Sequence, residues 1–167
     1  GNSGTSTRLL VGLSAGHPIT VFFTGDASLI KRPMSRVMKP LAEMGAQFMA
    51  RSDGRLPLGV RGSETLRSLT YRLPVPSAQV KSAILLAGLN VVGETMVIEP
   101  VPTRDHTENM LRHFGVAIDV DDLPDGARAV RIEGPKCFEG CAIDVPADPS
   151  SAAFPAVAAL LVPGSDV

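Results

Sequence analysis

The run Pro76-Ser77-Ala78-Gln79-Val80-Lys81-Ser82-Ala83-Ile84-Leu85-Leu86-Ala87-Gly88-Leu89 decides the fold. Its apolar residues leave little polar circumference on the helix that it predicts, and a helix that is apolar all round has to be buried. The segment 150–161 has the same character, although Pro155 is expected to kink that helix unless it lies in the first turn. The sequence therefore predicts a fold whose helices lie inside.

The chain repeats itself at a period a little over seventy residues, which indicates a tandem of similar units. Pro76-Ser77-Ala78-Gln79 aligns with Pro149-Ser150-Ser151-Ala152, and an apolar helix follows each of them. Gly62 and Gly134 close equivalent strands. The segment Gly4–Ala15 reads as the same helix from a preceding unit.

Each unit reads as strand, helix, strand, helix and then two strands, which is a βαβαββ order. The second helix of a unit ends in a glycine before a new strand, at 43–48 and again at 113–118. The segment 116–120 alternates apolar with polar residues, as expected of a strand with one buried and one wet face. Typical strand segments are 68–73, 95–99, 116–120, 129–133 and 142–145.

The second helix of the first unit is amphipathic, with its apolar residues at helical spacing on one side. Those residues are Met34, Val37, Met38, Leu41 and Met44. Such a stripe is typical of core packing rather than of a cofactor site. Buried helices combined with half-wet strands place the sheets outside the helices, which inverts the usual layering of an α/β fold.

Composition indicates one soluble globular domain, because 167 residues with 44% hydrophobic and 20% charged residues suffice for a sizeable core. A formal net charge of −1 argues against a general nucleic-acid or anionic-membrane surface. No apolar run reaches the roughly 18 residues that would cross a membrane. Cys137 and Cys141 lack the second ligand pair of a structural zinc site, so we expect buried or idle thiols and no metal. We expect no cofactor.

Gly1-Asn2-Ser3-Gly4-Thr5 leads into a helix, and a glycine-containing turn that aims free N–H groups is a natural anion site. The same run also fits ordinary capping, with Ser3 or Thr5 as the N-cap. Arg32 precedes Pro33, which fits the first turn of a helix, so we expect Arg32 at a helix N-terminus. A cation there opposes the helix dipole, which favours a ligand-binding role.

Ser77, Ala78 and Gln79 open the buried helix, so a hydroxyl, backbone N–H groups and a side-chain amide converge at one helix end. Ser77 also fits as the N-cap, and both functions are compatible. Two interpretations of Lys81 remain open: a solvated charge on the helix, or a contribution to the electrostatic field at the helix end. Lys81 is left out of the predicted site.

Arg104 directly precedes Asp105, and Glu108 follows three residues later, which is a capping-box-like pattern. That spacing favours structural roles for Asp105 and Glu108. His106 has no paired nucleophile or carboxylate in the sequence pattern and is not predicted to act as a base.

Four runs together resemble the 5-enolpyruvylshikimate-3-phosphate (EPSP) synthases of the shikimate pathway, which glyphosate inhibits. They are Gly1-Asn2-Ser3-Gly4-Thr5, Gly25-Asp26-Ala27-Ser28-Leu29-Ile30-Lys31-Arg32-Pro33-Met34, Pro76-Ser77-Ala78-Gln79-Val80-Lys81-Ser82-Ala83 and Thr103-Arg104-Asp105-His106-Thr107-Glu108. The resemblance implies an α/β fold, the inside-out α/β barrel of the enolpyruvyl transferases, with repeated βαβαββ units. It also implies that residues 1–167 form a single incomplete domain with about two repeats, the second domain being absent.

The resemblance further implies the reaction: the enolpyruvyl group of phosphoenolpyruvate moves to the 5-hydroxyl of shikimate-3-phosphate, and phosphate is released. Arg32 and Gln79 are the implied catalytic residues, and Gln79 lies between the two substrates. Ala78 stands where other branches have Ser, so it offers its backbone at most. The implied substrate-binding residues are Asn2, Gly4, Arg32, Ser77, Ala78, Gln79 and Arg104.

Two features of the resemblance point in opposite directions for glyphosate. The residues of the four runs are most similar to those of the class II branch, whose known members often tolerate glyphosate. A Cβ at position 4 would push into the glyphosate and phosphoenolpyruvate pocket, so Gly4 predicts sensitivity. We favour Gly4 because steric effects act locally.

Two alternatives remain: the sister transferase that uses UDP-N-acetylglucosamine and shares the barrel, and a non-catalytic module that binds a phosphorylated ligand. The implied partners are phosphoenolpyruvate, shikimate-3-phosphate, glyphosate as inhibitor and the missing second domain of the same polypeptide, with neither nucleic acid nor membrane. We expect a cytoplasmic location. We also expect residues 1–167 alone to be inactive, because the family's acid and base residues fall outside them.

Overall fold

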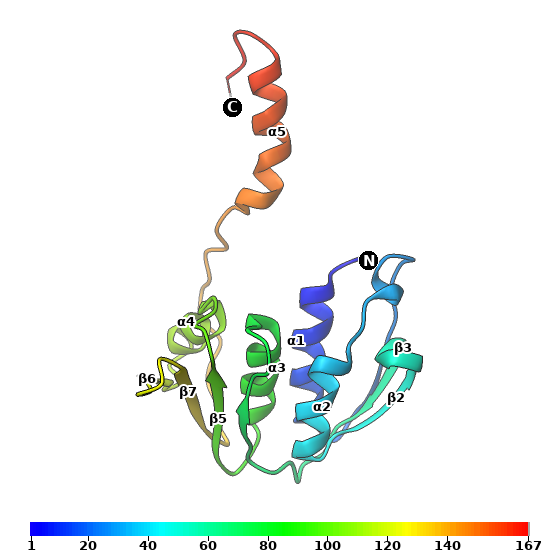
Figure 1. Ribbon diagram of the computed structural model, residues 1–167, viewed down its shortest axis with the longest axis vertical. Helices are drawn as coiled ribbons and strands as arrows, with labels where there is room; N and C mark the ends of the chain where they lie inside the picture. Colours follow the sequence, from blue (N-terminus) through cyan, green and yellow to red (C-terminus); the bar gives the residue numbers. More distant parts are fainter. Residues whose placement is uncertain (167) are drawn as a thin grey trace.

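The structure is a computed structural model that describes residues 1–166, with Pro149 described through its backbone alone. Two sheets flank a group of helices, and one further helix stands apart from this body (Figure 1). The helices are α1 (Gly4–Ala15), α2 (Ser35–Met44), α3 (Ala78–Gly88), α4 (His106–His113) and α5 (Pro149–Leu161), with short 3-10 turns η1 (Leu29–Lys31) and η2 (Ser52–Gly54). The strands are β1 (Thr20–Phe23), β2 (Gln47–Arg51), β3 (Arg55–Arg61), β4 (Thr70–Arg72), β5 (Gly93–Glu99), β6 (Asp119–Asp122) and β7 (Arg128–Gly134).

The two sheets have matching topologies. The first has the order β1-β3-β2 and is antiparallel throughout, while the second has the order β4-β5-β7-β6. In the second sheet β4 and β5 are parallel, with α3 as their crossover, and the other pairs are antiparallel. β5, β7 and β6 therefore repeat the arrangement of β1, β3 and β2. The second unit has the expected βαβαββ order.

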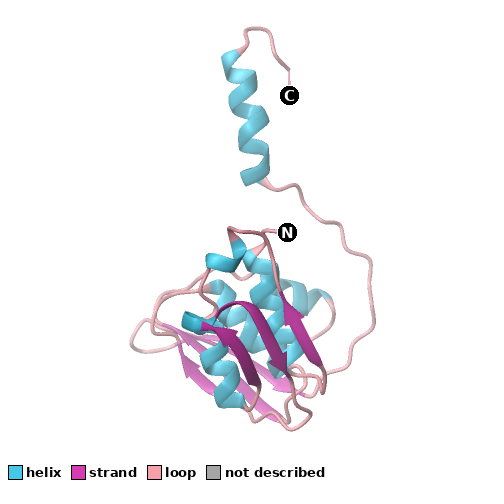
Figure 2. Cartoon of the chain, turned by 90° about the vertical axis from the view of Figure 1, so that its right-hand side faces the viewer, coloured by secondary structure: helices cyan, strands magenta, loops and turns pink. Residues whose placement is uncertain are grey.

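The helices α1 and α3 lie between the sheets, as the sequence predicted (Figure 2). α3 is buried along its length from residue 80 to residue 88 because it packs on α1, α2, β5 and β7. The α2 side chains Val37, Leu41 and Met44 are buried in the same core, which confirms their assignment to packing. The fold is thus an α/β arrangement with helices inside and sheets outside.

Two glycines mark the same place in the two units. A Cβ on Gly62 would overlap the carbonyl oxygens at the end of α1, and a Cβ on Gly134 would overlap those at the end of α3. The helix ends repeat as well: Gly45 and Gly115 both have positive φ, and the next residue's N–H bonds back into the preceding helix. The period seen in the sequence is therefore a structural repeat.

Two strand predictions need correction. The segment 142–145 forms no strand, and β6 begins at Asp119 rather than at residue 116. By the repeat, 142–145 corresponds to β4, whose hydrogen-bonding partner is the strand that follows the next helix. Residues 162–166, which follow α5, form no strand, so 142–145 has no such partner among the described residues.

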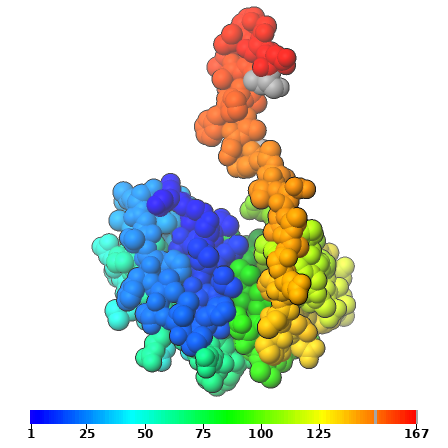
Figure 3. Space-filling model, turned by 180° about the vertical axis from the view of Figure 1, so that it is seen from behind, coloured from blue at the N-terminus to red at the C-terminus, as the bar shows by residue number. Residues whose placement is uncertain are grey.

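The prediction that the last apolar helix is buried is wrong for this chain. α5 forms, with Asp148 as its N-cap and Pro155 inside it, but it stands clear of the body (Figure 3). Its large apolar side chains are exposed, with Phe154 at 81% and Leu160 at 86%. An apolar helix is buried only where other elements surround it, and here the elements of the body pack with one another.

Among the residues described, no helix has both the length and the apolar character that a membrane crossing requires.

Candidate functional site

The N-terminal ends of α1 and α3 lie together and form the base of the candidate site. Ser3 caps α1 by accepting a hydrogen bond from the Ser6 N–H at 3.1 Å, and Ser77 caps α3 by accepting one from the Val80 N–H at 3.4 Å. The Gln79 amide nitrogen then donates to the Thr5 hydroxyl at 2.8 Å, which ties the two helices together. Two helix ends thus aim their free N–H groups at one region.

Arg8 joins this region from the second turn of α1. Its guanidinium donates to the side-chain oxygen of Gln79 at 2.7 Å and to the carbonyl oxygen of Pro33 at 3.2 Å. Burial, with added repulsion from Arg32 and Arg36, lowers the pKa of Arg8. The Gln79 amide is therefore held at both ends, its oxygen by Arg8 and its nitrogen by Thr5.

Arg32 faces the same place from the other side. Its guanidinium donates to the side-chain oxygen of Asn2 at 3.2 Å. A Cβ built on Gly4 would lie 3.0 Å from one Arg32 nitrogen and 3.1 Å from one Arg8 nitrogen. Two guanidinium groups thus flank a residue without a side chain, an arrangement suited to an anion with several oxygen atoms.

The expected placement of Arg32 at a helix N-terminus is wrong. Arg32 is the C-cap of η1, and its N–H bonds to the carbonyl oxygen of Leu29. α2 starts only at Ser35, with Met34 as its N-cap, so Pro33 lies before the helix rather than in its first turn. Arg32 reaches the site from a turn, and the opposition to a helix dipole does not arise.

The remaining predicted residues line a pocket of about 500 Å³ beside this cluster. The lining residues are Pro76, Ser77, Ala78, Gln79, Pro102, Thr103 and Arg104. A second pocket of about 120 Å³ shares Ala78, Gln79 and Arg104 with it, and Thr5 also lines that pocket. The structure therefore brings all seven predicted site residues into one continuous region, with Gln79 at its centre.

The predicted capping box at Asp105 does not form. Asp105 is the N-cap of α4 but makes no side-chain capping bond. Glu108 is buried and pairs instead with the Lys81 ammonium at 2.6 Å. A buried carboxylate near a buried ammonium gains more from that ion pair than from a backbone N–H, so the α4 turn is arranged around Lys81.

The sequence-based prediction missed Arg8, Thr5 and Lys81. Arg8 follows Gly4 by four residues, a helical spacing that directs its side chain back over Gly4, and this was the available signal. Lys81 is the one charged residue in the apolar run 80–89, and a charge in a fully buried helix has to be paired. Thr5 had no signal beyond its possible role as an N-cap.

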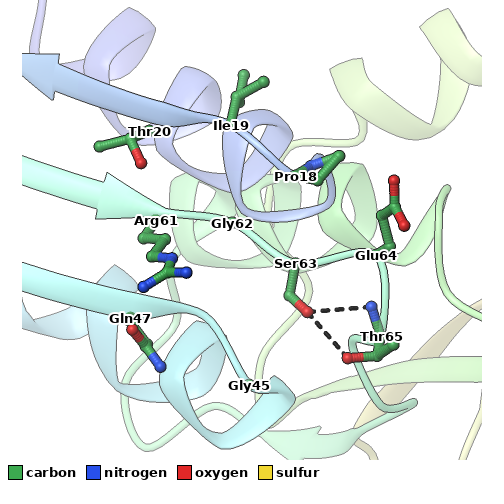
Figure 4. Close-up of a pocket in the computed structure, with 10 residues that line it drawn as sticks. All are labelled: Pro18, Ile19, Thr20, Gly45, Gln47, Arg61, Gly62, Ser63, Glu64 and Thr65. Carbon is green, nitrogen blue, oxygen red and sulfur yellow. Dashed lines mark hydrogen bonds between the residues drawn. The ribbon is translucent and has the colours of Figure 1, made fainter.

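Another pocket, of about 420 Å³, lies at the opposite end of α1 (Figure 4). α1 has 12 residues, so about 18 Å of helix separates this pocket from the Gly4 region. Its lining residues are Pro18, Ile19, Thr20, Gly45, Gln47, Arg61, Gly62, Ser63, Glu64 and Thr65. It contains none of the predicted site residues.

Cys137 and Cys141 are free and exposed, so of the two expected alternatives, buried or idle thiols, the buried one is wrong. In the described part of the chain, no three His, Cys, Asp or Glu side chains are grouped so that they could hold a metal ion.

A family model described as EPSP synthase (3-phosphoshikimate 1-carboxyvinyltransferase) matches residues 1–167. The chain belongs to the EPSP synthase family. It is 62% identical over its whole length to the 3-phosphoshikimate 1-carboxyvinyltransferase of Parvibaculum lavamentivorans, of which it covers 37%. It is 63% identical to the enzyme of that name from Novosphingobium aromaticivorans, of which it covers 38%. As an EPSP synthase family member it thus spans little more than a third of these curated relatives.

The fold comparison agrees with this family. A solved EPSP synthase from Acinetobacter baumannii matches 95% of the chain with a TM-score of 0.80 and 50% sequence identity, and the chain covers 35% of that structure. The inside-out α/β arrangement is therefore the EPSP synthase fold.

Proposed function

We propose that the full-length protein carrying this segment transfers the enolpyruvyl group of phosphoenolpyruvate to the 5-hydroxyl of shikimate-3-phosphate. In this reaction the methylene carbon of phosphoenolpyruvate gains a proton, and the acceptor hydroxyl loses its proton as its oxygen bonds the neighbouring carbon. The C–O bond to phosphate then breaks, and loss of a methyl proton restores the double bond. The names of the matched relatives support this reaction.

The observation that carries the proposal is the position of Gln79. Its amide oxygen accepts from Arg8 beside the Gly4–Arg32 cluster, while the residue itself lines the pocket that Arg104 also lines. One residue thus borders both a cationic anion site and a larger polar pocket. This suits a reaction that joins two anionic substrates.

The proposed roles follow from these positions. Arg32 and Gln79 are the catalytic residues that stabilise negative charge around the tetrahedral intermediate, and Asn2 and Gly4 leave room for the phosphoenolpyruvate phosphate. Ser77, the Ala78 backbone and Arg104 hold shikimate-3-phosphate. Glyphosate occupies the phosphoenolpyruvate side. The proton donor and acceptor lie outside residues 1–167, so residues 1–167 alone are inactive.

The first test is turnover by the full-length enzyme. We expect consumption of phosphoenolpyruvate with shikimate-3-phosphate and none with UDP-N-acetylglucosamine. Arg32→Ala is expected to cost at least about 1.5–3 kcal/mol in kcat/KM, the range of a charge-assisted hydrogen bond, mainly through phosphoenolpyruvate. Turnover with UDP-N-acetylglucosamine instead would favour the sister transferase, and near wild-type kinetics of Arg32→Ala would reject the role of that residue.

A second test uses the 167-residue chain itself. Calorimetric or NMR titration with shikimate-3-phosphate is expected to show binding that weakens in Gln79→Ala and in Arg104→Ala, with UDP-N-acetylglucosamine as the negative control. Binding without turnover by the full-length protein would favour a non-catalytic module for phosphorylated ligands. Turnover by the 167 residues alone would contradict the proposed division of the site.

The proposed compartment is the cytoplasm. The support is chemical, because both proposed substrates are multiply charged phosphorylated anions, which do not cross membranes unaided.

A further inference from the structure

Lys81 lies beneath the candidate site and is fully buried, with a relative exposure of 0%. Its ammonium nitrogen lies 3.1 Å from a Glu99 carboxylate oxygen and 2.6 Å from a Glu108 carboxylate oxygen. Its third partner is the carbonyl oxygen of Arg104, also at 3.1 Å. All three N–H donors of the ammonium therefore have an acceptor.

These acceptors bracket one loop. Glu99 ends β5, Glu108 lies in the first turn of α4, and the segment 100–105 between these elements carries Arg104. The Thr103 hydroxyl donates to the other Glu99 oxygen, which ties the middle of the loop to the same cluster. Lys81 of α3 therefore contacts Glu99 before this loop, Arg104 within it and Glu108 after it. Glu99 in turn binds Thr103 in the middle of the loop.

The charge balance of the cluster argues against a role in stability alone. It combines one ammonium with two carboxylates, and Glu99 and Glu108 are exposed by only 0% and 2%. One oxygen of Glu108 is buried without a hydrogen-bond partner. Apolar side chains of similar volume would fill such a place with less desolvation cost, so stability alone does not account for this ion cluster.

We propose that Lys81 is a positioning residue, which holds the segment 100–105 so that the Arg104 side chain faces the pocket lined by Ser77, Ala78 and Gln79. The inference rests on the proposed function, because it assigns the acceptor phosphate to Arg104. Lys81 itself touches no substrate. It acts by fixing the Arg104 backbone, from which the exposed guanidinium extends.

The test compares variants of the full-length enzyme. The main variant combines Lys81→Met with Glu99→Gln and Glu108→Gln, so that no unpaired charge stays buried. We expect its KM for shikimate-3-phosphate to rise at least about tenfold, while its KM for phosphoenolpyruvate changes less than about twofold. Lys39→Met, on the exposed face of α2, is the matched control and is expected to change neither value.

A double-mutant cycle with Arg104→Ala separates positioning from general stability. If Lys81 acts through Arg104, the triple substitution is expected to change KM for shikimate-3-phosphate by less than about twofold in an Arg104→Ala background. An equal effect in both backgrounds would overturn the proposal. So would parallel losses for both substrates.

NMR order parameters give a readout that needs neither substrate nor a folded variant. In the unaltered protein, the backbone N–H vectors of Thr103, Arg104 and Asp105 are expected to have higher order parameters than those of the extended segment 139–147. Equally low order parameters in both segments would overturn the proposal even if the triple variant failed to fold. Absence of turnover by the unaltered enzyme, together with a rigid loop, would instead reject the proposed function but not the positioning of the loop by Lys81.

Discussion

Gly4 lies where any side chain would meet two cations, with a built Cβ 3.0 Å from Arg32 and 3.1 Å from Arg8. In the full-length enzyme we expect Gly4→Ala to displace both guanidinium groups by a few tenths of an ångström. A displacement of about 1 Å at a reacting centre costs about a hundredfold, so a rise of several-fold in KM for phosphoenolpyruvate is expected. Glyphosate inhibition is expected to weaken with it.

Steady-state kinetics with and without glyphosate checks this prediction. Gly140→Ala is the matched control, because it lies far from this cluster and a Cβ there meets nothing within 4 Å. Unchanged KM and unchanged inhibition in Gly4→Ala would show that the arginines yield freely or that the phosphate binds elsewhere.

Gln79 offers a substitution that keeps its shape and changes its charge. A glutamate in its place would still accept from Arg8 but could not donate to Thr5, and it would add a negative charge beside the proposed anion site. A unit charge a few ångström away costs several kcal/mol at the effective dielectric of a protein surface. We therefore expect Gln79→Glu to lower kcat/KM for phosphoenolpyruvate at least about tenfold, measured at saturating shikimate-3-phosphate.

Capping patterns indicated the helix starts at which several candidate residues lie, and the family resemblance assigned binding roles to those residues. Asn2, Gly4 and Ser77 to Gln79 are of this kind. Arg8 and Lys81 escaped because their roles depend on which helix lies beside them, and α1 meets α3 only in the folded chain. The predicted helix position of Arg32 failed for a related reason, since a single proline did not reveal that α2 begins two residues later.

Close contact between α1 and α3 depends on Gly12. A Cβ there would lie 2.6 Å from the Cα of Ala83 and nearer still to its carbonyl oxygen, and neither backbone atom has room to move. We expect Gly12→Ala to reduce the free energy of unfolding by about 1–3 kcal/mol, the usual range for overpacking a core. Urea denaturation measures this, with Gly140→Ala as the control because its Cβ would meet nothing within 4 Å.

The second sheet carries an ion pair between Arg72 of β4 and Asp125 in the turn between β6 and β7, at 2.6 Å. The hydrogen bond from Arg72, helped by one from the Ala127 N–H, lowers the pKa of Asp125. A lowered pKa in the folded state means that stability is present above the pKa of the unfolded chain and is lost as pH falls through the folded value. Both side chains are half exposed, so the effect is small and weakens with salt.

We therefore expect Asp125→Asn to flatten the acid dependence of the unfolding free energy between pH 7 and about pH 3. Thermal unfolding at several pH values in low salt measures it. An unchanged acid slope in the variant would mean that the pair contributes nothing to the pH dependence.

Helix and strand predictions succeeded at the scale of the element where a segment's neighbours are close in sequence. β6 and β7 pair through a short turn, and α3 crosses between β4 and β5. The segments 142–145 and 150–161 have the same sequence patterns as their equivalents in the earlier units. They lack the neighbouring elements that bury those equivalents. Apolar periodicity predicts which face of an element seeks contact, and the contact itself depends on the rest of the fold.

For the molecule as a whole, α5 exposes large apolar side chains to water, including Leu161 at 77%. Exposed apolar patches drive association. We expect the 167-residue chain to associate as its concentration rises and a variant lacking residues 147–167 to remain monomeric with an unchanged melting temperature. Sedimentation velocity and thermal unfolding check both parts, and a large drop in melting temperature would show that α5 contributes to the body.

α3 is the one buried helix that contacts α1 and α2 of the first unit as well as β5 and β7 of the second, among the described elements. Neither repeat can lose its structure without exposing the apolar surface of this shared helix. The body is therefore expected to unfold in one cooperative step, with equal calorimetric and van't Hoff enthalpies, despite its tandem sequence. Repetition in the sequence does not make the units thermodynamically independent.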